Sequence, residues 1–347
     1  MTQTPLAPSA AARQPGTRIA LRTLAIAATL PYIALKVAWV LGSRIGIPDG
    51  SPLLDHRTTM IVANGITILM DSAVVVITLL LTQAWGRRVP AWLLVLPMWV
   101  ASGLLLPIMT GYPLQMVVGL ARGGDSGSGE PPFLDGWVFG IVYGGFILQG
   151  LALGALFALY TRDRWGHLWK GALRDLAPSP TGPALRTTAV VASLLAIAPA
   201  VMHLVWATGS TAGLSEGGIA DRNDVFYLME ALSSLFAVAA AAGVLLLAFR
   251  RRSALPLAVP LALAWGGSAA SACWGGWMSL ASLTAAEDLS EQATPAMMLI
   301  YGVQMLLGAL VVTLGGYFFS ERAAALPVRS AGSPATAPAA RPSGARA

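Results

Sequence analysis

Four ionisable side chains lie within long apolar stretches of this sequence: Lys36, Asp71, His203 and Glu230. At the centre of a membrane helix such a group costs about 2.5–3.5 kcal/mol on insertion scales. Lys with Asp and His with Glu make two complementary pairs, and a facing pair removes most of the penalty that either charge bears alone. The sequence therefore predicts that Lys36 meets Asp71 and that His203 meets Glu230 inside a membrane protein.

The two pairs differ in the chemistry that they offer. A Lys–Asp pair stays charged near neutral pH, whereas free histidine has a pKa of about 6.5 and titrates there. If function needs a mobile proton, we expect it at His203 and Glu230. Two interpretations stay open with equal weight: a substrate or proton site, and a structural clamp that holds helices together. Asp71 is the strongest single candidate, because it lies deepest within an apolar run.

Polar residues recur at helical spacing around both acids. They are Asn64, Thr67, Asp71 and Thr78 in one segment, and Asn223, Tyr227, Glu230 and Ser234 in the other. Trp39 and Trp206 follow the basic members by three residues, on the same helix face. A polar stripe on an apolar helix faces protein or water rather than lipid. We therefore expect a small polar cavity above each pair, open to the outside and about 9–10 Å deep.

The same uncommon residues appear in the same order in the two halves of the chain. Lys36-x-x-Trp39-x-x-Gly42-Ser43 is matched by His203-x-x-Trp206-x-x-Gly209-Ser210, and Asn64 with Asp71 is matched by Asn223 with Glu230. Apolar helices match readily at Ala, Leu and Val, but much less readily at Trp, Asn and charged residues. The pattern predicts an internal duplication with four helices per half, which makes the repeats parallel.

The composition identifies the class of protein that must position these residues. Of 347 residues, 56% are hydrophobic and 11% are charged, and the mean hydropathy is +0.67. These values exclude a soluble globular enzyme, a disordered chain and a nucleic-acid-binding domain. The single cysteine, Cys273, excludes an intrachain disulfide and a multi-cysteine metal site.

Eight stretches are long and apolar enough to span a bilayer. They run near 20–42, 58–82, 89–111, 136–160, 187–208, 225–249, 254–282 and 296–319. The seventh is long, so we expect it to be tilted, or broken near its paired glycines. The predicted fold is an all-α, polytopic membrane helix bundle of eight transmembrane helices, arranged as two parallel four-helix repeats. Its parts are a disordered tail (1–18), the first repeat (19–164), a cytoplasmic linker (165–186), the second repeat (187–322) and a disordered tail (323–347).

Arginines in the connecting loops predict the orientation. Basic residues concentrate on the side of the two termini, while most acidic residues fall on the other side. By the positive-inside rule, both termini are cytoplasmic. Abundant Arg, Ala, Gly and Pro indicate a GC-rich bacterial genome, so the expected location is a bacterial plasma membrane.

Composition and symmetry leave three classes of function. The favoured one is a small-solute transporter or channel, with proton coupling as a variant. The alternatives are a non-catalytic partner or sensor in a membrane complex, and an integral membrane enzyme acting on a lipophilic substrate. We expect the lipid bilayer as a partner, with a small solute if transport is correct, and no nucleic acid, cofactor or metal. Pocket geometry around Asp71 and Glu230 should separate the classes.

Overall fold

The computed structural model describes residues 15–54, 57–121, 134–176, 181–249, 253–284 and 292–325. It is all-α within these ranges. Both chain ends, the Gly/Ser run at 123–129 and the arginines at 250–252 lie outside the described residues. The helices are α1 (Pro15–Val40), α2 (Arg57–Thr82), α3 (Ala91–Ala121), α4 (Gly136–Trp169), α5 (Gly182–Ala207), α6 (Glu216–Ala220), α7 (Asp224–Phe249), α8 (Ala258–Thr284) and α9 (Pro295–Ala325).

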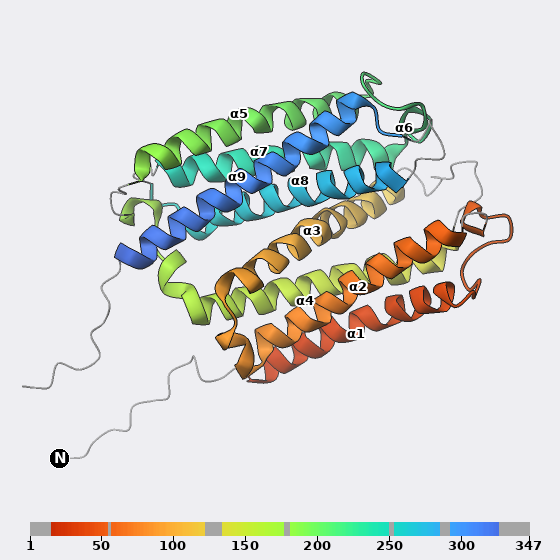
Figure 1. Cartoon of the computed structure of the whole chain (residues 1–347), viewed down its shortest axis with the longest axis horizontal. Helices are drawn as coiled ribbons and strands as arrows, with labels where there is room; N and C mark the ends of the chain where they lie inside the picture. The colour runs from red at the N-terminus through yellow and green to blue at the C-terminus, as the bar shows by residue number, and fades with distance from the viewer. Residues whose placement is uncertain are drawn as a thin grey trace, which may run out of the picture.

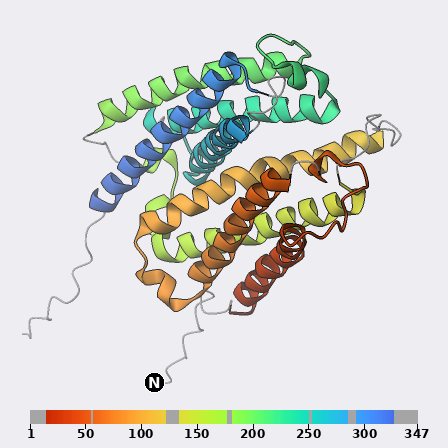
Figure 2. The same ribbon diagram turned by 45° about the vertical axis from the view of Figure 1, so that its right-hand side comes forward.

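The long helices form two groups that follow the order of the chain. Helices α1 to α4 pack against one another, and so do α5, α7, α8 and α9. The groups meet mainly where α3 packs on α8, with further contacts from α3 to α7 and from α4 to α9 (Figures 1 and 2). The first described residues of α1 and the last of α9 lie at the same end of the bundle (Figure 1).

Seven helices are long and apolar enough to cross a membrane: α1, α2, α3, α4, α5, α7 and α9. This composition supports an integral, multi-pass membrane protein. Helix α8, with 27 residues, is as long as several of them but is not among the seven. Its glycines, serines and tryptophans lower its hydropathy, and it occupies the position of the seventh predicted span. The count of eight spans therefore stays a prediction.

The structure changes the predicted outlines of three segments. Helix α3 continues to Ala121, through ten residues assigned to an outer loop, and Pro113 is accommodated inside it. Helix α4 continues to Trp169, into the predicted linker. Helix α8 is continuous, so the predicted break at its glycines is absent, and its axis is inclined to those of α5 and α7 (Figure 2). Its glycines serve close packing instead.

Glycines let the backbones of neighbouring helices touch. A methyl group added at Gly103 of α3 would lie 2.3 Å from the carbonyl oxygen of Ala269 on α8. At Gly243 and Gly267, added methyl groups would lie 2.3 Å and 2.4 Å from backbone nitrogens of the facing helix, in the contact of α7 with α8. Small residues at such contacts are typical of helix association in membranes, where no hydrophobic force drives helices together.

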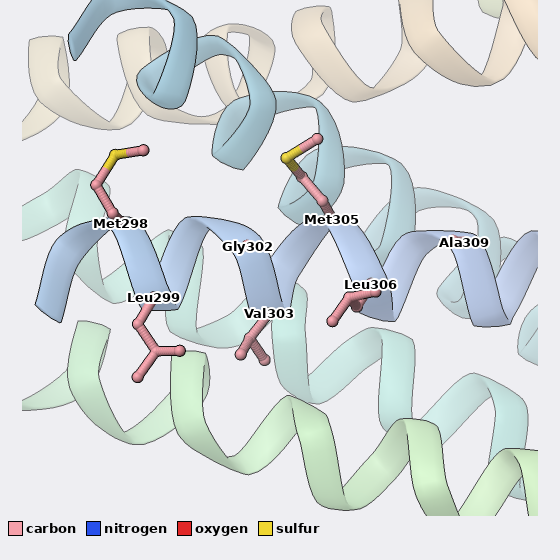
Figure 3. Close-up of a pocket in the computed structure, with 7 residues that line it drawn as sticks. All are labelled: Met298, Leu299, Gly302, Val303, Met305, Leu306 and Ala309. Atoms are coloured by element: carbon pink, nitrogen blue, oxygen red, sulfur yellow. The ribbon is translucent and has the colours of Figure 1, made fainter. Parts of the chain in front are cut away.

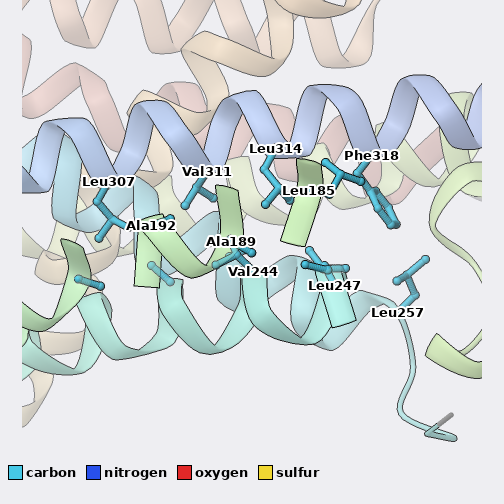
Figure 4. Packing of buried hydrophobic residues seen from close by; sticks show 14 of the residues in the cluster. Leu185, Ala189, Ala192, Val244, Leu247, Leu257, Leu307, Val311, Leu314 and Phe318 are labelled. Atoms are coloured by element: carbon cyan, nitrogen blue, oxygen red, sulfur yellow. The ribbon is translucent and has the colours of Figure 1, made fainter. Parts of the chain in front are cut away.

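An apolar core fills the space between α5, α7 and α9 (Figure 4). Leu185, Ala189, Ala192, Val244, Leu247, Leu307, Val311, Leu314 and Phe318 belong to it, and all are buried. A second cluster, centred on Leu94, Met98, Leu153 and Leu156, joins α2, α3 and α4. Both clusters lie between the ion-pair level and the end that holds the termini. Within the described residues, the buried hydroxyl of Thr78 lies beside the second cluster.

We predict that cysteines on opposite ends label oppositely in whole cells. In a Cys273→Ala background, Asp49→Cys or Thr211→Cys should react with an impermeant maleimide. Arg174→Cys or His167→Cys should react only after the membrane is permeabilised, because the positive-inside rule predicts that the arginine-rich end is cytoplasmic. All four positions are exposed, so access to reagent is set by the membrane. The reverse labelling pattern would overturn the orientation.

Candidate functional site

The first predicted pair forms between α1 and α2. Lys36 Nζ donates to Asp71 Oδ2 over 2.9 Å. The two residues are 1% and 5% exposed, respectively, which makes this a closed pair rather than the floor of an open cavity. The expectation of an outward-opening cavity above Lys36 and Asp71 is therefore wrong for the first half.

Aromatic rings complete the surroundings of Lys36. Its Nζ lies 3.5 Å from the centroid of the Tyr32 ring, one helical turn away on α1. Phe146 of α4 packs against Tyr32 edge-on, with centroids 4.9 Å apart. A cation over a ring face gains electrostatic stabilisation, most of all where water is excluded. The ammonium group is thus held by a carboxylate and a ring, with three helices enclosing it.

The second predicted pair forms between α5 and α7 and gains a third member from α9. His203 Nδ1 lies 2.5 Å from Glu230 Oε2. His203 Nε2 lies 2.9 Å from Gln304 Nε2. Trp206 packs edge-on against the imidazole, with centroids 5.3 Å apart, and Tyr301 of α9 interacts electrostatically with Glu230. His203 therefore links three helices through both of its ring nitrogens.

The Gln304 contact can be made in two ways. With the amide nitrogen toward the ring, Gln304 donates to His203 Nε2, and the ring proton on Nδ1 is donated to the Glu230 carboxylate. A second proton on Nε2 would face the Gln304 NH₂ group, donor against donor. Turning the amide over would relieve this clash, because Gln304 Oε1 would then accept from Nε2–H.

Gly275 of α8 lies beside this amide. A methyl group added there would be 2.9 Å from Gln304 Oε1. Because Gly275 has no side chain, the carboxamide of Gln304 fits between α5 and α8. Gln304 therefore lies at the contact of α9 with α8 and also reaches His203 of α5.

The two pairs are covered to different extents toward the end of the bundle opposite the termini. Asp71 follows the start of α2 at Arg57 by 14 residues, which is about 21 Å of helix. Glu230 follows the start of α7 at Asp224 by six residues, about 9 Å. The Glu230 side chain is 17% exposed, compared with 8% for that of Asp71. The second pair thus lies closer than the first to the end of the bundle opposite the termini, and its acid is more exposed.

The other predicted site residues have local structural roles. Asn64 Nδ2 donates to the Met60 carbonyl within α2. Asn223 Oδ1 accepts from the Phe226 amide at the start of α7. Neither asparagine reaches an ion pair, so the predicted polar stripe does not converge on the acids.

Trp39 and Trp206 close the turns that follow α1 and α5. Trp39 Nε1 donates to the Ile45 carbonyl, and Trp206 Nε1 to the Ala212 carbonyl, each over 2.8 Å. In both turns the glycine at the helix end, Gly42 or Gly209, has φ of 97°. The left-handed conformation suits glycine, which has no Cβ to clash. The tryptophans therefore support the helix ends that carry Lys36 and His203.

A pocket lies along α9 (Figure 3). It is a shallow groove of about 580 Å³ between Met298 and Ala309. Met298, Leu299, Gly302, Val303, Met305, Leu306 and Ala309 line it, so the lining is apolar. Within the described residues, no group of three or more His, Cys, Asp or Glu side chains is placed to hold a metal ion.

Comparison of the chain with protein-family models, with curated proteins and with solved structures finds no match. The site must therefore be interpreted from its own geometry.

Two contributors to the site, Gln304 and Tyr32, were not predicted from the sequence. Gln304 is a neutral amide in an apolar helix, and Tyr32 is an aromatic residue one turn before Lys36. A buried amide needs a partner as much as a charge does, which is a signal that the sequence does contain.

We predict strong coupling between Lys36 and Asp71. Asp71→Ala should lower the free energy of unfolding by about 3–5 kcal/mol, because it leaves a buried ammonium unpaired. Adding Lys36→Ala should recover a large part of that loss. Thermal denaturation of the purified single and double variants measures the coupling.

The exposed pair Arg18–Asp163 is the matched control. Removing either or both partners should change stability by less than about 1 kcal/mol. Additive losses from Lys36→Ala and Asp71→Ala would mean that the buried pair contributes nothing as a pair.

Proposed function

We propose that this membrane protein responds to protons from the outer aqueous phase, through His203, Glu230 and Gln304, and that it acts as a pH-responsive sensor or partner. The observation that carries the proposal is the pair of contacts made by His203, to Glu230 at 2.5 Å and to Gln304 at 2.9 Å. A histidine with both nitrogens engaged converts its protonation state into a packing change between helices. In this proposal Lys36 and Asp71 form a permanent clamp.

The surroundings on the inner side favour a sensor over a conduit. Ser234 Oγ donates to the Ala200 carbonyl one turn further in, which links α7 to α5 and uses the hydroxyl. Further in, Ala196, Ala192 and Val244 are buried in the apolar core. A proton that reaches His203 from outside meets no titratable side chain among these residues.

Proton-linked transport of a small solute is the second candidate. It is favoured by the side-by-side arrangement of two helix groups, which resembles transporter halves by analogy only. Transport would require the apolar core between α5, α7 and α9 to open during the cycle. An enzyme acting on a lipophilic substrate has less support, because the groove on α9 carries no polar or titratable side chain.

Matching turns support the proposed internal duplication. A methyl group added at Gly46 would lie 2.4 Å from Val138, and one at Gly213 would lie 3.0 Å from Ala296. The offset is 167 residues for the glycines and 158 for their neighbours, in line with the sequence correspondences. If the halves share an ancestor, Gln304 stands where the first half has Phe146, so the proton-responsive contact exists in one half alone.

We predict that the pH dependence of stability between about pH 5 and 8 depends on His203. The apparent melting temperature of the wild type should vary over this range, where histidine titrates. His203→Lys should flatten the profile, because lysine keeps its charge throughout. His167→Gln, which removes an exposed histidine on α4, is the control and should leave the wild-type profile unchanged. If the wild type and His203→Lys give superimposable profiles, His203 and Glu230 form a structural clamp and do not respond to pH.

A second variant tests the role of the amide. Gln304→Glu places a carboxylate beside His203 Nε2 and favours the doubly protonated ring, so the midpoint of the profile should move to higher pH by about one unit or more. A group that gains a partner in its protonated form contributes stability below its titration range and loses it as pH rises. The variant should therefore gain stability over the wild type at pH 5 and lose that gain toward pH 8. If the midpoint does not move, Gln304 takes no part in the pH response of His203.

Sensing and transport differ in what crosses the membrane. Protein reconstituted into liposomes with an internal pH dye should pass no protons after external acidification if it is a sensor. Proton entry that disappears in Glu230→Gln would establish transport instead.

A further inference from the structure

Two adjacent arginines, Arg87 and Arg88, lie at the arginine-rich end of the bundle. Arg87 and Arg88 end the short helix η3 (Ala84–Arg88), and both side chains are exposed. Within the described part of the chain, neither forms an ion pair. Arg162 and Arg174 at the same end, by contrast, lie within 4 Å of Asp163 and Asp175. Arg87 and Arg88 are therefore free to bind an external anion.

The turn that presents them is held firmly by α4. Tyr160 OH donates to the Gly86 carbonyl over 2.9 Å, and Arg164 Nη2 donates to the Val89 carbonyl over 2.9 Å. Arg164 Nη1 also donates to Tyr160 OH. Gly86 is buried against α2, where a methyl group would lie 1.8 Å from the Leu80 carbonyl oxygen. The backbone is thus fixed on both sides of the two arginines, which lowers the entropy lost when they bind a ligand.

Exposed aromatic and aliphatic side chains flank the arginines. Trp85 is 49% exposed and Trp92 is 67% exposed. Leu96 and Val100 follow Trp92 at intervals of four residues on α3 and are also exposed, so the three lie on one stripe along the helix. Tryptophans of this kind sit at the headgroup level of a bilayer, and an exposed apolar stripe beyond them faces acyl chains.

We propose that η3 and the start of α3 form a binding site for an anionic phospholipid. Arg87 and Arg88 hold the phosphate through charge-assisted hydrogen bonds. Trp85 and Trp92 contact the glycerol region, and one acyl chain lies along the stripe of Trp92, Leu96 and Val100. The stripe distinguishes a lipid from a free phosphate ion, because an inorganic anion has nothing to place on it. The site is separate from His203, Glu230 and Gln304 and does not depend on their function.

Native mass spectrometry of the detergent-solubilised protein tests the site. Titration with phosphatidylglycerol should show a tightly retained lipid, and phosphatidylcholine of the same chain length should bind less tightly. Because each arginine near an anionic headgroup contributes about fivefold to binding, the double variant Arg87→Gln/Arg88→Gln should bind phosphatidylglycerol about 30-fold more weakly. Both side chains are exposed, so the fold tolerates the change.

The matched control is Arg162→Gln/Arg174→Gln, which removes the same charge from the same end and should weaken binding less than threefold. Trp92→Ala keeps every charge and should still weaken lipid binding. Soluble glycerol phosphate should compete poorly. Equal losses in the two double variants would reduce the site to general electrostatics, and full competition by glycerol phosphate would mean that a phosphate and not a lipid is bound. Either result overturns the proposal.

Discussion

The burial of charge in an apolar environment is the constraint on which the rest of this structure depends. Lys36 and Asp71 are almost completely enclosed, and each is tolerable only because the other lies 2.9 Å away. Removing both charges from water is costly even for a pair, so the geometry has to be maintained by the helices around it. Tyr32 and Phe146 contribute by covering the ammonium group from α1 and α4. Helices α1, α2 and α4 therefore pack so as to enclose the hydrogen bond between Lys36 and Asp71.

The same constraint is met differently in the second helix group. Where the first group surrounds its cation with rings, the second offers His203 a carboxylate and an amide. The acid also lies nearer to the outer end of its helix. The side chains of the first pair are 2% and 8% exposed, whereas those of the second are 7% and 17% exposed. Two sites related in sequence pattern thus differ in both partners and burial.

Much of this arrangement was predictable, for identifiable reasons. Membrane helices follow from the length and apolarity of their segments, and all eight predicted stretches are helical. The partners of Lys36 and His203 followed from the high cost of unpaired charge, which leaves few alternatives. Gln304 did not follow, because its role depends on how α9 lies against α5, a tertiary relation that no local pattern encodes. The unequal burial of Asp71 and Glu230 was not predictable either, because it depends on where α2 and α7 begin. The sequence also did not show that Asn64 bonds to the backbone of its own helix and that Asn223 caps the start of α7.

The contact between α3 and α8 has a mechanical consequence. At Gly103 the backbones of α3 and α8 lie so close that an added methyl group would clash with the carbonyl oxygen of Ala269. Trp99 Nε1 of α3 donates to Ser268 Oγ of α8 over 3.2 Å along the same line. Contacts of α3 with α7 and of α4 with α9 extend the interface on either side of this line. A side chain larger than hydrogen at position 103 would push the backbones of α3 and α8 apart, so this one residue sets the distance between the two groups of helices.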